Sequence, residues 1–148
     1  MIPKRQLGEK LGEILVRNGT ISEEQITRAL DFQKREGGLL GEILIKLGYV
    51  NEQEIVQALT AQYGFPYLPL ENYDLNKDCI GIVPENVARQ YNLVPLDLIG
   101  DLLTIAMSNP LNSRAIDDLE MITKRKAQVF ISTVTSINDS INKLYKGK

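Results

Sequence analysis

The chain has 148 residues, 43% hydrophobic and 24% charged, which is typical of a globular protein with one ordinary domain or two small ones. Seventeen Lys and Arg against 19 Asp and Glu leave a net charge of −2, so nothing in the overall charge favours a general nucleic-acid or membrane-surface binder. The chain has no histidine, which excludes histidine acid–base catalysis and histidine-ligated zinc, and its one cysteine excludes an internal disulfide.

The single cysteine, Cys79, suits a reducing compartment, and we expect it to be a small buried apolar side chain rather than a reactive thiol. No apolar run approaches the roughly 20 residues that span a bilayer. The first residues also lack the apolar core of a signal peptide. We therefore expect a cytoplasmic protein without direct membrane insertion.

The first third of the chain contains the same pattern twice, at a constant offset of 29 residues. The sequence LGEILV at 11–16 returns as LGEILI at 40–45. A constant offset over many positions indicates a duplicated supersecondary unit. The remaining matched pairs are Gly19 and Gly48, Ile21 and Val50, Ile26 and Ile55, Ala29 and Ala58, Leu30 and Leu59, and Gln33 and Gln62.

Each copy is predicted to be two short helices joined by a tight turn. In the first copy, apolar residues from Leu7 to Leu15 follow helical spacing and Gly19 ends the helix. Ser22 and Gln25 have the spacing of a capping box, which begins a second helix that runs to about Arg35.

The second copy repeats this plan with a helix over about 39–47 and a stop at Gly48. Asn51 and Glu54 then have capping-box spacing and begin a helix that carries Gln62. Together the two copies predict a small four-helix bundle.

After the bundle, the prolines of 66–70 predict an extended connector, because proline cannot continue a helix. Pro84 is expected to open a helix that ends near Tyr91. The segments 93–98 and 102–107 are predicted strands of a hairpin that turns at 100–101.

The last third is predicted to hold a helix over 115–123, a strand over 128–132 and a helix over 137–145. The connection from the second strand to the third has the length of a crossover. We therefore expect an α+β fold: a four-helix tandem-repeat bundle, then a small α+β subdomain with about three strands and helices on one face. The expected boundaries are 1–65 for the bundle with repeats 10–33 and 39–62, 66–77 for an extended linker, and 78–148 for the α+β subdomain.

The glycine of each Leu-Gly pair, Gly12 or Gly41, lies near the start of a helix, where backbone N–H groups lack partners. A glycine there would let a phosphate or a flat base approach the backbone. The alternative is that both glycines only allow close helix packing. Gly19 and Gly48 are interpreted mainly as helix stops.

Two further positions have both a binding and a structural interpretation. Gln33 and Gln62 recur at one register, which indicates either hydrogen bonding to a ligand or to the other repeat, or simple capping. Lys10, directly before the first Leu-Gly, either pairs with a phosphate or is a solvated side chain; the matching residue, Leu39, cannot bind an anion.

We find no catalytic constellation in the sequence. The phosphate loop Gly-x-x-x-x-Gly-Lys-Ser/Thr does not occur, so the chain is not expected to hydrolyse a nucleotide in the P-loop way. The carboxylates of Asp117, Asp118 and Glu120 are neighbours on a predicted helix but point different ways, as on a solvated face. We expect a domain that is not an enzyme.

The doubled pattern over 10–33 and 39–62 resembles the N-terminal domain of the GspE/PilB/MshE group, the type II secretion and type IV pilus assembly ATPases. The segments 62–67, 84–89 and 102–110 resemble the continuation of that domain, so the resemblance extends over essentially the whole chain. It implies a bacterial module involved in protein transport or pilus assembly that carries no motor of its own.

The resemblance implies a non-catalytic regulatory and docking domain. Its expected partners are cytoplasmic parts of inner-membrane secretion or pilus platform proteins, and the ATPase motor where this chain is a fragment, with no DNA or RNA. The expected location is cytoplasmic, at the inner membrane through protein partners. No cofactor is required.

The alternative that the resemblance implies is a sensor that binds cyclic di-GMP across the two repeats. In the binding members both repeats typically begin with arginine, whose planar fork contacts guanine or phosphate. Lys10 keeps the charge without the fork and Leu39 has neither. The candidate site residues are Lys10, Leu11, Gly12, Gly19, Gln33, Leu40, Gly41, Gly48 and Gln62.

Overall fold

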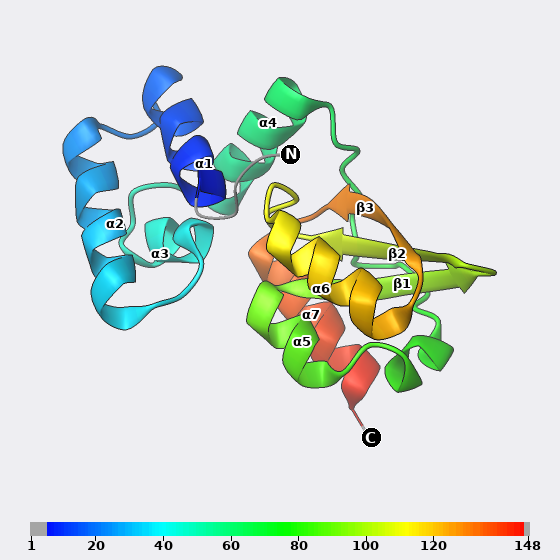
Figure 1. Cartoon of the computed structure of the whole chain (residues 1–148). Helices are drawn as coiled ribbons and strands as arrows, with labels where there is room; N and C mark the ends of the chain where they lie inside the picture. Colours follow the sequence, from blue (N-terminus) through cyan, green and yellow to red (C-terminus); the bar gives the residue numbers. More distant parts are fainter. Residues whose placement is uncertain (1–5, 147–148) are drawn as a thin grey trace. The chain divides into compact units, whose positions relative to one another are not determined.

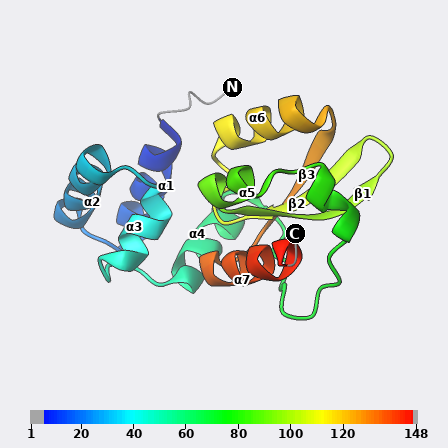
Figure 2. The ribbon, with the colours of Figure 1, turned by 90° about the horizontal axis from the view of Figure 1, so that it is seen from below.

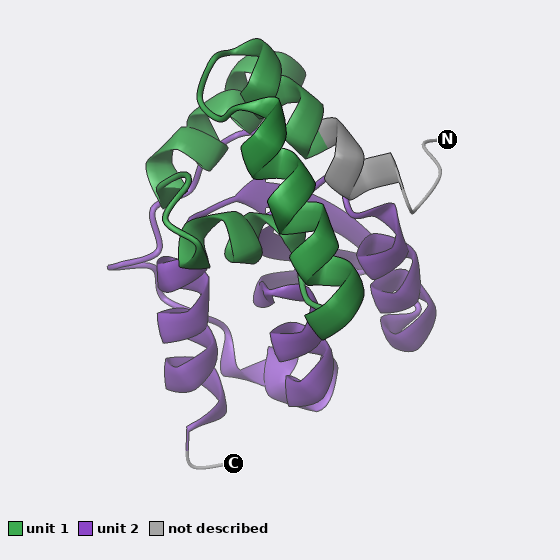
Figure 3. Ribbon diagram, turned by 90° about the vertical axis from the view of Figure 1, so that its left-hand side faces the viewer, with its two compact units in different colours: residues 1–64 green, residues 65–148 purple. Residues whose placement is uncertain are grey.

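The computed structural model describes residues 6–146, with side chains from residue 11 onward. The chain forms two compact units, unit 1 over residues 1–64 and unit 2 over residues 65–148 (Figure 3).

The regular elements in the described part of unit 1 are all helices, and they confirm the two predicted helix pairs (Figure 1). Gly19 and Gly48 follow α1 and α3 with φ of 76° and 80°, a left-handed backbone that ends each helix at a glycine as predicted. The four helices are α1 (Gln6–Arg17), α2 (Glu23–Glu36), α3 (Leu40–Lys46) and α4 (Glu52–Tyr63).

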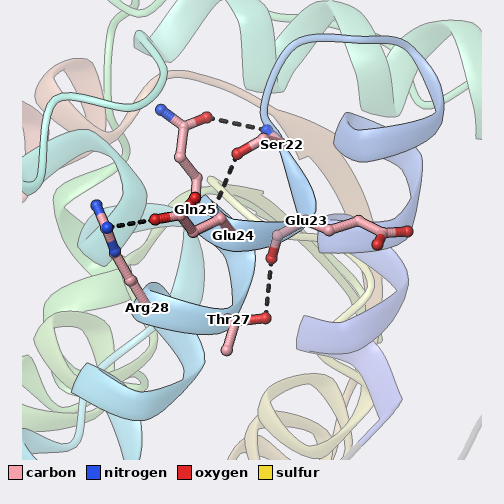
Figure 4. A network of polar contacts seen from close by, with 6 residues as sticks. All are labelled: Ser22, Glu23, Glu24, Gln25, Thr27 and Arg28. Carbon is pink, nitrogen blue, oxygen red and sulfur yellow. Dashed lines mark hydrogen bonds and ion pairs between the residues drawn. The ribbon is translucent and has the colours of Figure 1, made fainter.

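Both predicted capping boxes are present. The Ser22 hydroxyl accepts a hydrogen bond from the Gln25 N–H at 3.1 Å, and the Gln25 side chain accepts one from the Ser22 N–H at 2.9 Å (Figure 4). Asn51 and Glu54 repeat the exchange at 2.8 and 2.9 Å. Each box satisfies N–H groups that the first helical turn leaves unpaired.

The segment 66–77, expected to be an extended linker, lies within unit 2 and contains a turn at 71–72. The Leu68 N–H donates to the Ile131 carbonyl at 3.0 Å, and the Ile131 N–H donates to the Pro66 carbonyl at 2.9 Å. Leu70 is 3% exposed in the core of unit 2. Burial of Leu70 and these two hydrogen bonds hold the segment against the sheet.

Unit 2 contains the predicted three-stranded sheet in the order β1-β2-β3. β1 and β2 form the predicted antiparallel hairpin, and β2 and β3 are parallel, with α6 as the crossover. Its elements are the 3-10 helix η1 (Lys77–Gly81), α5 (Glu85–Tyr91), β1 (Leu93–Ile99), β2 (Leu102–Met107), α6 (Ser113–Thr123), β3 (Lys126–Ile131) and α7 (Val134–Tyr145).

The α+β class is confirmed, but the expectation of helices on one face of the sheet is wrong. α6 covers one face and α7 the other (Figures 1 and 2). The physical reason is that both faces carry buried apolar residues: Ile105 and Ala106 are neighbours in β2, point to opposite faces, and are each 0% exposed. A sheet that is apolar on both sides needs cover on both sides.

Cys79 is fully buried in the core of unit 2, as expected. Burial, with the charges of Asp97 and Asp78 as further causes, raises the pKa of the thiol to about 11. The thiolate is therefore disfavoured and the side chain acts as a small apolar group. Within residues 6–146, no helix is long and apolar enough to cross a membrane.

Candidate functional site

The two Leu-Gly pairs of the repeats pack against each other reciprocally. A Cβ placed on Gly41 would lie 3.7 Å from the Leu11 Cδ2 atom, and a Cβ placed on Gly12 would lie 3.8 Å from the Leu40 Cδ2 atom. Leu11 and Leu40 are 0% and 2% exposed. Each leucine thus covers the glycine of the other copy, as expected of two copies related by a pseudo-two-fold axis.

The same glycines also receive an isoleucine from the second helix of their own copy. A Cβ on Gly12 would lie only 2.6 Å from the Ile26 Cδ1 atom, whereas one on Gly41 would lie 3.6 Å from the Ile55 Cδ1 atom. Gly12 therefore permits a close approach that alanine would obstruct, which supports the packing interpretation of this residue.

The two recurring glutamines have different partners. The Gln33 amide donates to the Gly38 carbonyl at 3.0 Å, just beyond its own helix, and so caps the end of α2. The Gln62 carbonyl accepts from Arg17 at 3.1 Å, a hydrogen bond between the two repeats. Gln33 therefore caps a helix and Gln62 bonds the other repeat, which are the two structural alternatives considered for these glutamines.

The cations at the ends of α1 and α3 both reach across to the other repeat. Arg17 bonds Gln62, and Lys46, its counterpart 29 residues later, lies 5.5 Å from the centroid of the Phe32 ring. These cations hold the repeats together through a hydrogen bond in one case and a cation–π contact in the other.

The two positions that distinguish the repeats for anion binding lie near their first helices. The backbone of Lys10 is in α1, and its side chain is outside the described part of the structure. Leu39 is the N-cap of α3 and makes no side-chain capping bond. Glu42, in the first turn of α3, has its pKa raised by burial.

An open groove of about 500 Å³ lies between α1 and α2, beside Gly12. Its apolar part is formed by Val16, Ile26 and Leu30, which are all half-buried. Gly12 is thus the candidate site residue that opens onto this groove, while Leu11 and Leu40 are in the core.

Two of the three matching positions of the second copy are buried, while Ile45, the counterpart of Val16, is half-buried. Ile55 and Leu59, the counterparts of Ile26 and Leu30, are 5% and 0% exposed. Among the described residues, the first copy therefore leaves more of this apolar face accessible than the second copy does.

The rim of the groove carries charged side chains. Glu13 and Glu23 are exposed and neither forms an ion pair with another described residue, whereas Arg17 is engaged by Gln62. The sequence did not single out the groove. A comparison of the two copies could have indicated it, because polar Thr27 in the first copy occupies the position of apolar Val56 in the second.

The described residues therefore define a class of protein: a tandem helical repeat joined to a small three-stranded α+β unit, with no cluster of metal-binding side chains between residues 6 and 146. A family model for the MshEN domain matches residues 63–148. The chain belongs to the MshEN domain family, a non-catalytic type of domain found in assembly ATPases.

Two relatives of the chain are type IV pilus assembly ATPases. The chain is 34% identical over 139 residues to the type IV pilus assembly ATPase PilB of Myxococcus xanthus, covering 94% of this chain and 25% of the relative. It is 32% identical to PilB of Thermus thermophilus, covering 92% of this chain and 19% of that one. The chain thus spans a quarter or less of the length of these relatives.

Two solved structures share the fold. A structure of MshE with cdg has a TM-score of 0.67 and 31% identity, covering 91% of this chain and 98% of that one. The N-terminal domain of XpsE has a TM-score of 0.75 at 19% identity, covering 96% and 98%. The MshE match includes the tandem repeats, which lie outside the residues matched by the family model.

Proposed function

We propose that this domain is a non-catalytic docking module of a pilus or secretion assembly ATPase, and that it binds a cytoplasmic segment of an inner-membrane component of the machinery. The observation that carries the proposal is the open α1–α2 groove, in which Ile26 and Leu30 are half-buried whereas their counterparts Ile55 and Leu59 are buried. An amphipathic helix that lays its apolar side in such a groove is a common mode of recognition.

The charges on the rim indicate the complementary side chains of the partner. Glu13 and Glu23 are both exposed and without an ion pair among the described residues. A partner helix with Lys or Arg beside its apolar stripe would pair with them. Complementary charge of this kind favours the choice of partner and the rate of association more than raw affinity.

The test is a charge-reversed variant, Glu13→Lys with Glu23→Lys, in the full-length parent ATPase. We expect loss of co-purification with the cytoplasmic parts of the inner-membrane components, since two attractive contacts become repulsive. The matched control is Asp117→Lys with Asp139→Lys, which changes the same charge at exposed positions of unit 2. Equal capture by both variants would contradict the proposal.

A second candidate function is favoured by one specific observation, the likeness to MshE with cdg at 31% identity. We take cdg to be cyclic di-GMP, and the proposed ligand site is the set of nine candidate residues given in the sequence analysis. Ile26 packs closely against Gly12, within 2.6 Å of the position of a Cβ, whereas the contacts at Gly41 are ordinary. A ligand that contacts Gly12 on this side requires Ile26 to move.

Calorimetric titration with cyclic di-GMP separates the two functions. The parent chain is compared with a Lys10→Arg, Leu39→Arg variant, which restores arginine at the start of both repeats. Micromolar binding by the parent would establish a sensor. No binding by the parent with a gain in the variant would leave docking as the function of this chain.

A further inference from the structure

Four exposed apolar side chains gather at one end of unit 2. Ile99 (69% exposed) and Leu102 (39%) flank the turn of the β1–β2 hairpin, and Met121 (73%) and Ile122 (47%) lie in the last turn of α6. The Lys126 N–H donates to the Asp101 carbonyl at 2.9 Å, which ties the hairpin turn to the chain that leaves α6. We call residues 99–102 and 121–126 the tip of unit 2.

The tip is also basic. Lys124, Arg125 and Lys126 follow one another, and none of the three forms an ion pair with a described residue. Asp101 and Glu120 share a cavity of about 330 Å³ with these cations. The Glu120 carboxylate already accepts a hydrogen bond from the Ala127 N–H at 2.8 Å. The local charge is therefore positive although the chain as a whole is slightly negative.

The apolar side chains lie on both sides of the sheet. Leu103 is 1% exposed and pairs with Ala127, whose N–H is bonded by Glu120 of α6, so Leu103 points to the face that α6 covers. Leu102 alternates with Leu103 and pairs with Ile99, so both point to the other face. Met121 is on the outer side of α6, away from the buried Leu119.

This distribution distinguishes two kinds of partner. A rigid protein surface or groove would contact one side of the tip and leave the other apolar pair in water. A fluid phase surrounds a projecting loop and contacts all of its sides. Apolar side chains that enter the interface together with Lys and Arg at the level of anionic headgroups are typical of peripheral membrane attachment.

We propose that the tip of unit 2 docks on the surface of an anionic lipid bilayer. Ile99, Met121 and their neighbours enter the interfacial layer, while Lys124 and Lys126 contact the lipid phosphates. The site is separate from the α1–α2 groove, so it does not depend on the proposed docking of a protein partner.

The first test is flotation of the full chain with vesicles of phosphatidylcholine alone and with phosphatidylglycerol added. We expect binding to the anionic vesicles, weakened by salt, and none to the neutral ones. Because each cation near such a surface contributes about fivefold in partitioning, Lys124→Gln with Lys126→Gln should weaken binding about 25-fold. The matched control, Lys34→Gln with Arg35→Gln, removes two exposed cations of α2 and should bind like the parent.

A second readout reports the depth of the tip. The chain has no tryptophan, so Ile99→Trp and, as a control, Lys34→Trp each introduce a single fluorophore at an exposed position. Only the tip tryptophan should shift its emission to the blue with anionic vesicles. No binding to anionic vesicles, or an equal loss in the control charge variant, would overturn the proposal. Tip variants that abolish capture by a protein while vesicles never bind would assign the tip to a protein partner instead, and would overturn it too.

Discussion

At the residue scale, the two Leu-Gly pairs pack the repeats against each other, as the distances from each glycine to its neighbours show. Each glycine receives a leucine of the other copy and an isoleucine of its own, but the contact is much tighter at Gly12 than at Gly41. The two copies are therefore similar without being equivalent, and the same substitution should affect them differently.

Alanine substitution tests this difference. In Gly12→Ala the new Cβ would lie 2.6 Å from the Ile26 Cδ1 atom and 2.8 Å from its Cγ1 atom, so we expect a net loss of about 1 kcal/mol, overpacking outweighing the better helix propensity. In Gly41→Ala the nearest contacts are ordinary, and we expect a gain of about 0.5 kcal/mol. Urea unfolding of both variants measures the contrast. Equal changes would show that Gly12 is not a close-packing position.

A second residue-scale prediction concerns alkaline pH. The Cys79 pKa is raised from 9.0 to about 11, mainly by burial, so the folded state keeps a proton that the unfolded chain loses. The contribution of this thiol to the free energy of unfolding is complete below pH 9 and is lost as the pH rises from 9 to 11, on the order of 2 kcal/mol.

The measurement is urea unfolding from pH 8 to pH 11. Burial also raises the pKa of Tyr145, so part of the decline in the free energy of unfolding with pH comes from this residue. Cys79→Ala should remove the cysteine part of the decline, and an unchanged slope in that variant would refute this assignment.

At the element scale, the helices and strands follow from local chemistry, which is why most of them could be predicted from the sequence. Two capping boxes, glycine stops and apolar strand segments each depend on neighbours in the chain. The cover on both faces of the sheet could not be predicted, because Ile105 and Ala106 indicate two buried faces only once the partners of β2 are known. The groove and the tip were missed for the same reason: exposure is a property of the packed structure.

The capping boxes give the element-scale prediction. Ser22→Ala and Asn51→Ala each remove the side-chain oxygen that accepts an N–H of the first turn, at 3.1 and 2.8 Å. Each should lower the free energy of unfolding by about 1 kcal/mol. Gln53→Ala, an exposed position in the first turn of α4, serves as a control for substitution near a helix start. Loss of stability no greater than in the control would mean that the boxes do not stabilise α2 and α4.

At the scale of the whole molecule, the chain consists of two units of different construction. The large apolar cluster that includes Cys79, Leu96 and Ile141 lies entirely within unit 2, and the segment before η1 is bonded to β3 of the same unit. Unit 1 instead relies on the contacts between its two repeats. Unit 2 therefore contains what a small domain needs to fold alone.

The corresponding prediction is that a fragment of residues 65–148 unfolds cooperatively in urea, with the near-ultraviolet circular dichroism of a packed core. A matched fragment that begins at residue 78 lacks Leu70 and the bonds to Ile131, and should be less stable by several kcal/mol. Equal stability of the two fragments would show that 66–77 is a linker after all.

The measurement that tests the docking function most directly is site-specific photo-crosslinking in cells that assemble the machinery. A photoreactive amino acid at Thr27, exposed on the rim of the α1–α2 groove, is compared with one at Lys34, exposed on the same helix outside the groove. We predict a crosslink from Thr27 to a cytoplasmic segment of an inner-membrane component, and none from Lys34. Equal labelling from both positions, or none from Thr27, would contradict docking through this groove.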